Sequence, residues 1–255
     1  MRLKLISCEV IHREMSAAIA CSPHQVDAEF LPKGLHSLGG RAMQARLQEA
    51  ADHAGSTPYD AVLFGYALCG NGTAGLASRT VPFVIPRAHD CIALLMGGDE
   101  RHRIYREDHP GVYYRSPGWL ERGQELEQAA LEQVRQRTGS GFSLEQLIAR
   151  YGPENGRFLF GQFQGYERNY EQLTYISTGL EPDASFEARA RREAGSRGWR
   201  FESVPGDLSL FAKLVSGDWD EANFLIVPPG WRVKATYDGG ILEKELSDPA
   251  GRAIV

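Results

Sequence analysis

Three of the four cysteines in this 255-residue chain occupy equivalent places in its predicted secondary structure. Cys8 ends the first predicted strand, Cys69 ends the third, and Cys91 begins the helix after the fourth. The carboxyl ends of parallel strands gather at one edge of an open sheet, where they line the ligand crevice. We therefore expect these three thiols to converge, together with His89, which lies two residues before Cys91.

Thiolate and imidazole groups are the ligands that soft and borderline metals select. The predicted metal site consists of Cys8, Cys69, His89 and Cys91, with zinc as the preferred metal and iron as the alternative. Three protein ligands and one open position are typical of catalytic zinc. The sequence has no CxxC pair, which argues against a closed structural zinc module. The alternative is that these cysteines are simply small buried residues.

The turn after Cys69 is rich in glycine and could direct backbone N–H groups at an anion. Gly70, Asn71 and Gly72 allow positive φ angles, and we predict that they bind a cofactor or a carboxylate or phosphate group. The turn matches neither the dinucleotide fingerprint nor a phosphate loop, so an ordinary tight turn is the alternative. It could also hold Cys69 exposed. Arg87 is predicted to bind an anionic substrate at the same edge.

Chemistry at a free thiol is a second way to use the same residues. A helix that begins at Asp90 and Cys91 would favour the thiolate. In a metal-free enzyme, Cys69 would be the nucleophile and His89 its base. Cys21 has small neighbours in a predicted helix and is expected in the core. His36 is a loop histidine that could approach the same edge of the sheet.

The elements that must position these residues alternate between strands and helices. Strands are predicted at 2–7, 26–31, 60–67, 81–85, 174–177, 199–204 and 223–230. Helices are predicted at 10–20, 41–55, 92–96, 118–137, 143–152, 185–198 and 208–217. Such alternation, with strands that are apolar at nearly every position, predicts an α/β protein with mainly parallel sheets.

The order of these elements suggests an internal division of the chain. We predict two Rossmann-like lobes, at 1–98 and 171–255, and an inserted helical region at 99–170. Both lobes read as strand, helix, strand ending in proline, helix and long apolar strand, although any α/β chain can look similar. If the repeat is real, the site lies in a cleft between the lobes, at the carboxyl ends of their strands.

Composition excludes several classes of protein. The chain has 42% hydrophobic and 24% charged residues, which are ordinary globular values and exclude a disordered chain. A net charge of −5 without a basic cluster argues against a nucleic-acid partner. The chain lacks the uninterrupted run of about 18 apolar residues that a membrane span needs. Its first residues do not resemble a secretory signal, so we expect a cytoplasmic protein with reduced thiols.

Five segments carry a resemblance to a known family. They are FGYALCGNGTAGL, VIPRAHDCIALLMGG, GVYYRSPGW, NYEQLTYISTGL and FLIVPPG. Together they resemble the domain-of-unknown-function family numbered 1638, over nearly the whole chain. The resemblance implies a genomic association with corrinoid-dependent methyltransferases that act on methylamines or betaines. It therefore suggests a role in one-carbon metabolism.

The expected function joins this association to the predicted ligands. Methyltransferases that activate a thiol acceptor against a methyl-corrinoid protein hold zinc by His-x-Cys and a further Cys, and His89, Cys91 and Cys69 have that ligand content. We expect zinc- or iron-dependent methyl transfer, with a corrinoid protein or methyltransferase as partner and a small molecule as methyl acceptor. One alternative is a non-catalytic accessory protein or chaperone that binds a corrinoid protein or its metal. The other is the metal-free cysteine enzyme.

Overall fold

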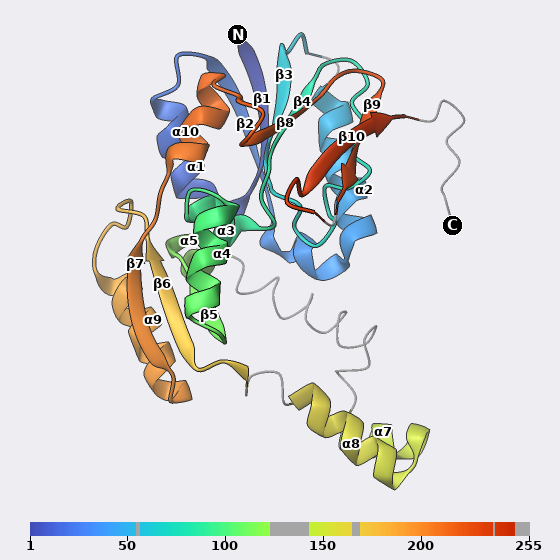
Figure 1. Cartoon of the computed structure of the whole chain (residues 1–255), viewed down its shortest axis with the longest axis vertical. Coiled ribbons are helices and arrows are strands. Elements are labelled where there is room, and N and C mark those ends of the chain that lie inside the picture. The colour runs from blue at the N-terminus through green and yellow to red at the C-terminus, as the bar shows by residue number, and fades with distance from the viewer. Residues whose placement is uncertain (55–56, 123–142, 165–168, 237, 248–255) are drawn as a thin grey trace.

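The computed structural model describes residues 1–54, 57–122, 143–164, 169–236 and 238–247 (Figure 1). The first part of the chain contains β1 (Arg2–Cys8), η1 (Glu9–Ile11), α1 (His12–Ala20), β2 (Gln25–Leu31), η2 (Lys33–Leu38), α2 (Gly40–Ala54), β3 (Ala61–Gly65), β4 (Phe83–Pro86) and α3 (Cys91–Leu95). The middle part contains α4 (Asp99–Asp108), β5 (Val112–Arg115), α5 (Pro117–Glu121), α7 (Leu144–Tyr151) and α8 (Pro153–Gln164). The last part contains β6 (Gln172–Ser177), α9 (Ser185–Arg197), β7 (Arg200–Pro205), α10 (Ser209–Ser216), β8 (Phe224–Val227), β9 (Trp231–Ala235) and β10 (Leu242–Leu246).

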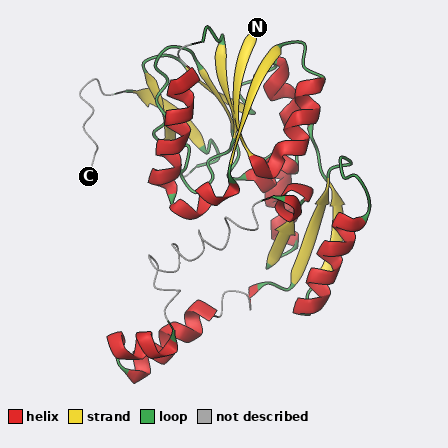
Figure 2. Cartoon of the chain, turned by 180° about the vertical axis from the view of Figure 1, so that it is seen from behind, coloured by secondary structure: helices red, strands yellow, loops and turns green. Residues whose placement is uncertain are grey.

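A five-stranded sheet forms the larger body of the protein, with the strand order β2-β1-β3-β4-β8. The first four strands are parallel, and β8 joins the edge of β4 in the antiparallel direction. Helices α1 and α10 cover one face and α2 covers the other (Figures 1 and 2). Because both faces are covered, all five residues of β3 are buried, as a continuous apolar run predicts.

A smaller parallel sheet, β5-β6-β7, lies beyond the carboxyl ends of the large sheet (Figure 1). Helix α9 packs on it around a separate small core that includes Leu173, Tyr175 and Ala190. The carboxyl ends of β6 and β7 turn towards α3. Asp207 N–H, just after β7, donates to the carbonyl of Leu95 at 2.9 Å. The carboxyl ends of both sheets therefore meet at one junction.

The α/β class and the mainly parallel sheets are confirmed, but sheet membership groups the chain differently from the predicted lobes. β8 and α10, which we placed in the second lobe, belong to the large body, where β8 pairs with β4 and α10 packs against α1. β5, which we placed in the helical insertion, pairs with β6. The apolar residues of β8 are better buried at the edge of β4 than in a short three-stranded sheet. The predicted helix at 118–137 lies outside the described residues from 123 onward.

None of the helices in the described ranges is both long enough and apolar enough to cross a membrane. The longest of the described helices, α2, has 15 residues and an exposed polar side.

Candidate functional site at the junction of the two sheets

The three predicted thiols are buried at the carboxyl edge of the large sheet, where we define them as the thiol cluster: Cys8, Cys69 and Cys91. Their exposed fractions are 2%, 9% and 7%. Cys8 is the last residue of β1, and its backbone leads directly into η1 and α1. All three belong to the main hydrophobic core. The prediction that the turn holds Cys69 exposed is therefore wrong.

Cys69 sits in a strained turn four residues after β3. Cys69, Gly70 and Asn71 all have positive φ angles, of 48°, 64° and 68°. A Cβ at the next residue, Gly72, would lie 2.3 Å from the sulfur of Met43 on α2, so any larger residue there would force the Met43 side chain to shift. The turn therefore takes its shape from close contact with α2. The role of this turn in binding an anion stays a prediction.

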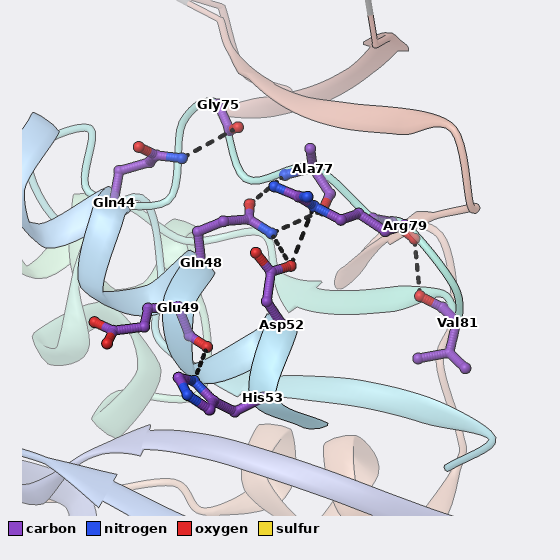
Figure 3. Close-up of polar contacts among 10 residues, drawn as sticks. Gln44, Gln48, Glu49, Asp52, His53, Gly75, Ala77, Arg79 and Val81 are labelled. Atoms are coloured by element: carbon purple, nitrogen blue, oxygen red, sulfur yellow. Dashed lines mark hydrogen bonds and ion pairs between the residues drawn. The ribbon is translucent and has the colours of Figure 1, made fainter. Parts of the chain in front are cut away.

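Helix α2 also holds the chain that follows this turn (Figure 3). The side-chain amide of Gln48 donates to Ala77 O at 3.0 Å and accepts from Ala77 N–H at 2.8 Å. Gln44 donates to Gly75 O at 3.4 Å, and Asp52 pairs with Arg79 at 3.2 Å. These contacts hold residues 75–79, which follow the turn at Cys69, against α2.

The loops that carry Cys69 and Cys91 run side by side. Leu68 and Cys69 donate backbone hydrogen bonds to Ala88 and His89, at 2.9 and 2.8 Å. Asp90 then caps α3, because its Oδ1 accepts from the N–H groups of the second and third helical residues at 3.0 Å each. Asp90 is thus the N-cap of α3, and the arrangement brings Cys91 to the same edge as Cys69.

The three thiols influence one another electrostatically. Burial raises the pKa of the Cys8 thiol to about 12, against the lowering effect of the Val10 N–H and of Lys33. Burial also raises the pKa of Cys69 and of Cys91, and the negative charge of Asp90 and of the neighbouring thiolates raises it further. The three residues lie at the same edge of the sheet, and their convergence into one site stays a prediction. Without a cation beside them, the thiols are protonated at neutral pH.

His36, and not His89, is the histidine nearest to a cysteine. Its Nε2 lies 3.6 Å from Cys8 Sγ, and its ring lies 6.2 Å from that of Tyr66. Burial lowers the pKa of His36, and the charge of Lys33 lowers it further, against the opposing effect of Asp90. The imidazole is therefore neutral at pH 7, which is the state in which histidine binds a metal.

His89 and Arg87 have other partners. His89 Nδ1 is 2.8 Å from Asp99 Oδ1, and 56% of the His89 side chain is exposed. Among the described residues, no hydrogen bond joins the His89 ring to a cysteine, and the contact with Cys69 is made by the His89 backbone carbonyl. The Arg87 guanidinium donates to the carbonyls of Phe224, Gly240 and Leu242, so it fastens β8 to the β9–β10 hairpin. The two predicted roles at the site are thus not supported by these contacts.

Three further residues border the thiol cluster and were not predicted. Only 5% of Lys33 is exposed, and its ammonium lies 4.6 Å from the centre of the Trp119 ring. Trp119 lies beside Cys91 and lowers the pKa of that thiol, although its indole N–H has no hydrogen-bond partner of normal geometry within the described residues. Tyr66 lies beside Cys8 and lowers the pKa of that thiol. Cys21, predicted to be in the core, is instead exposed at the end of α1.

The donor set suits a thiophilic metal chemically. Metal binding requires deprotonated thiols, and a cation would offset the effect of burial on the three thiolates. Within the described ranges, however, no three His, Cys, Asp or Glu side chains already stand in a group that could hold a metal ion. The residues that would hold it are the thiol cluster and neutral His36, after rotation of their side chains towards one another.

Comparison with known proteins gives a family and no function. Neither a search of the curated proteins nor a search of the solved structures found a match. One family pattern matches residues 30–215, which include His36, Cys69, Cys91 and Trp119 but not Cys8. Because this match covers well over half of the sequence, the chain belongs to the family described as "Protein of unknown function (DUF1638)".

Proposed function

We propose that the thiol cluster binds zinc or iron and that His36 replaces His89 as the nitrogen ligand. The observation that supports the proposal is the burial of three thiols at one edge of the large sheet, with a neutral imidazole 3.6 Å from one of them. Sulfur and imidazole donors select such metals. Lys33 lies close enough to lower the pKa of Cys8, and it would partly balance the negative charge of three thiolates.

The reaction we propose is methyl transfer in corrinoid-linked one-carbon metabolism in the cytoplasm. A bound metal would supply Lewis-acid chemistry, which lowers the pKa of a coordinated acceptor and makes it a nucleophile. The chain itself contributes burial, which excludes water from the cluster, and the capped α3, which fixes Cys91. A small methyl acceptor would bind beside the cluster, and the methyl donor would be presented by a corrinoid protein.

Metal analysis of four variants tests the binding proposal. The purified wild-type protein is expected to contain about one equivalent of zinc or iron, as does Cys21→Ser, whose thiol lies outside the cluster. Cys69→Ser should lose most of the metal. His36→Ala should lower metal affinity by about 10- to 100-fold, whereas His89→Ala should leave it unchanged. A wild-type protein without metal, or equal effects of the two histidine variants, would reject this ligand set.

A second reading is favoured by the contact between Cys8 and His36. A thiol with a neutral imidazole at 3.6 Å has the arrangement of a nucleophile and its base. In this metal-free reading, Cys8 and His36 take the roles that the sequence suggested for Cys69 and His89. A metal-depleted protein that keeps methyl-transfer activity, and loses it on alkylation of Cys8, would select this reading. Binding of a corrinoid protein without any methyl transfer would instead indicate an accessory protein.

A further inference from the structure

The small-sheet side of the junction, which faces the thiol cluster, carries buried polar atoms that have no hydrogen-bond partner. We define four of these side chains as the polar wall: His102 on α4, Tyr114 on β5, Ser116 between β5 and α5, and Trp119 on α5. Within the described part of the chain, His102 Nε2, Tyr114 OH, Ser116 Oγ and Trp119 Nε1 are all buried and unpartnered. Leaving even one such group unpaired costs stability.

The members of the polar wall face the large body and lie near one another. Side chains two residues apart on a strand point to the same face, so Tyr114 and Ser116 point together, and Tyr114 packs against the main core. The rings of His102 and Tyr114 are 5.4 Å apart. Trp119 stands beside Cys91 and under the Lys33 ammonium. The polar wall is therefore adjacent to the thiol cluster.

On the neighbouring strand β6, the buried polar side chains are paired. Gln172 donates to Thr174 Oγ1 at 2.9 Å, to Tyr105 OH at 3.0 Å and to Glu202 Oε2 at 2.8 Å. Tyr105 OH also lies 2.8 Å from Thr174 Oγ1. Unpartnered buried atoms occur elsewhere in the described residues as well, but four of them lie together at the carboxyl end of β5 and on the helices beside it. A bound ligand can satisfy a group of such atoms.

The chemistry of the polar wall selects an acceptor-rich ligand. Indole N–H is a donor only, and the two hydroxyls and the imidazole can all donate as well. Two cations stand beside the wall, Lys33 at Trp119 and Arg106 near Tyr114 and His102. Two anions also lie near the wall: Asp90 accepts two hydrogen bonds from the N-terminus of α3, and Asp99 is paired with His89. Both carboxylates therefore have partners of their own, and Lys33 and Arg106 offset their charge at the wall.

We propose that the polar wall binds the carboxylate or phosphate group of a small substrate and presents the rest of that molecule to the thiol cluster. Its meaning for catalysis rests on the function proposed above, but the binding itself does not require a metal. The hydroxyls of Tyr114 and Ser116 and the indole N–H of Trp119 donate to the oxyanion. Lys33 supplies the compensating charge.

Nuclear magnetic resonance of the indole N–H groups tests this proposal directly, since the chain has only four tryptophans. Sodium acetate and inorganic phosphate are titrated separately into the full-length protein, with sodium chloride as the control for ionic strength. The expected result is a saturable shift of the Trp119 signal with one of the two anions, which also decides between a carboxylate and a phosphate. No saturable shift with either anion would overturn the proposal.

Two variants and a matched control separate ligand binding from a structural role. Tyr114→Phe and Ser116→Ala each remove an unpartnered hydroxyl, so they should weaken anion binding by about fivefold or more without lowering Tm. Tyr113→Phe removes a hydroxyl from the opposite face of β5 and should leave the binding unchanged. Equal binding by Tyr113→Phe and Tyr114→Phe, or a Tm loss in both wall variants with unchanged binding, would show that the wall is structural.

The same samples distinguish this inference from the proposed metal site. The titration is run on zinc-loaded and on metal-free protein, and the metal content of each is measured. A saturable shift in a protein that binds no metal would reject the metal site and keep the polar wall. Stoichiometric metal without any Trp119 shift would reject the polar wall alone.

Discussion

The two parallel sheets end at the same junction but bring different chemistry to it. The large sheet contributes the three buried thiols, each held by a backbone feature: the end of β1, the strained turn after β3 and the capped start of α3. The small sheet contributes hydroxyl, indole and imidazole groups without partners. One side is therefore suited to a soft cation and the other to an oxyanion.

The two sides of the junction each reduce the stability of the fold, for different physical reasons. On the large sheet the cost is burial of thiols that would have to ionise, and on the small sheet it is burial of polar atoms that lack partners. Away from the junction, neither sheet shows the same departure: the residues of β3 are apolar, and Gln172 and Thr174 on β6 are paired. Departures from well-satisfied packing that gather in one place mark a functional site.

Removal of the metal is expected to give the largest effect, and on the large-sheet side only. If the protein is loaded at about a thousandfold above the dissociation constant, metal stabilises the fold by about 4 kcal/mol. For a chain of this size, that free energy corresponds to a loss of roughly 10 °C in Tm when a chelator is added. Differential scanning calorimetry with and without chelator measures the shift.

The two sides of the junction supply the controls for this measurement. Ser116→Ala changes the small-sheet side and should keep the full chelator-dependent loss of Tm. Cys69→Ser changes the large-sheet side and should show almost none, while Cys21→Ser behaves as wild type. A chelator effect that survives in Cys69→Ser would place the metal elsewhere.

Glu14 gives the second effect, because it lies in the seam between the two bodies. Only 1% of Glu14 is exposed, and within the described residues neither carboxylate oxygen has a hydrogen-bond partner of normal geometry. Burial raises its pKa to about 7, with Glu181 adding to the effect and Thr178 and Arg13 opposing it. Thr178 directly follows β6, so this carboxyl group reports on contact between α1 and the small sheet.

The sign of the pH effect follows from the raised pKa. Below the unfolded-state pKa of about 4.5, Glu14 is protonated in both states and carries no penalty. Between that value and pH 7 only the unfolded state loses the proton, so the free energy of unfolding falls as pH rises, by about 3 kcal/mol in total. Urea unfolding from pH 4 to pH 8 should show this loss in the wild type and not in Glu14→Gln.

A surface carboxyl provides the comparison for this measurement. Glu221→Gln alters an exposed residue and should follow the wild-type pH profile. Parallel profiles for wild type and Glu14→Gln would mean that water reaches Glu14, and the seam between the two bodies would then be open.

Periodicity and strand-end placement predicted much of this arrangement from sequence. The buried runs of β1, β3, β4 and β8 are apolar at most positions, and Asp90 before an apolar helix is a local capping signal. Because parallel strands share a carboxyl edge, the positions of Cys8, Cys69 and Cys91 in the sequence predicted that all three lie at that edge, where the structure has them. The pairing of β8 with β4 could not be predicted in this way, because the sequence of an edge strand does not indicate which strand it will join.

The two histidines show why the other contacts of the candidate site could not be predicted from the sequence. His89 is close to Cys91 in sequence, but the turn before α3 directs its ring to Asp99. His36 is 28 residues from Cys8 and meets it only because η2 folds back beside the end of β1. In the same way, Lys33 and Trp119 are neighbours across the junction and have no common sequence pattern. Such tertiary contacts are not encoded by spacing.

Loosening the loop after Cys69 should give the smallest effect and should act on one thiol. Gln48→Ala removes both hydrogen bonds to Ala77, which is expected to cost about 1–2 kcal/mol. If that loss falls on local opening of the loop, metal-free Cys69 should be alkylated about tenfold faster, as peptide mass spectrometry would measure. Cys8 is held by β1 and should react at the wild-type rate.

A weaker variant of the same loop is the control for this measurement. Gln44→Ala, which removes one longer hydrogen bond to Gly75, should accelerate the alkylation of Cys69 less. Equal acceleration of Cys8 and Cys69 would mean that the large-sheet edge opens as one unit, and that the individual loops do not hold the thiols separately.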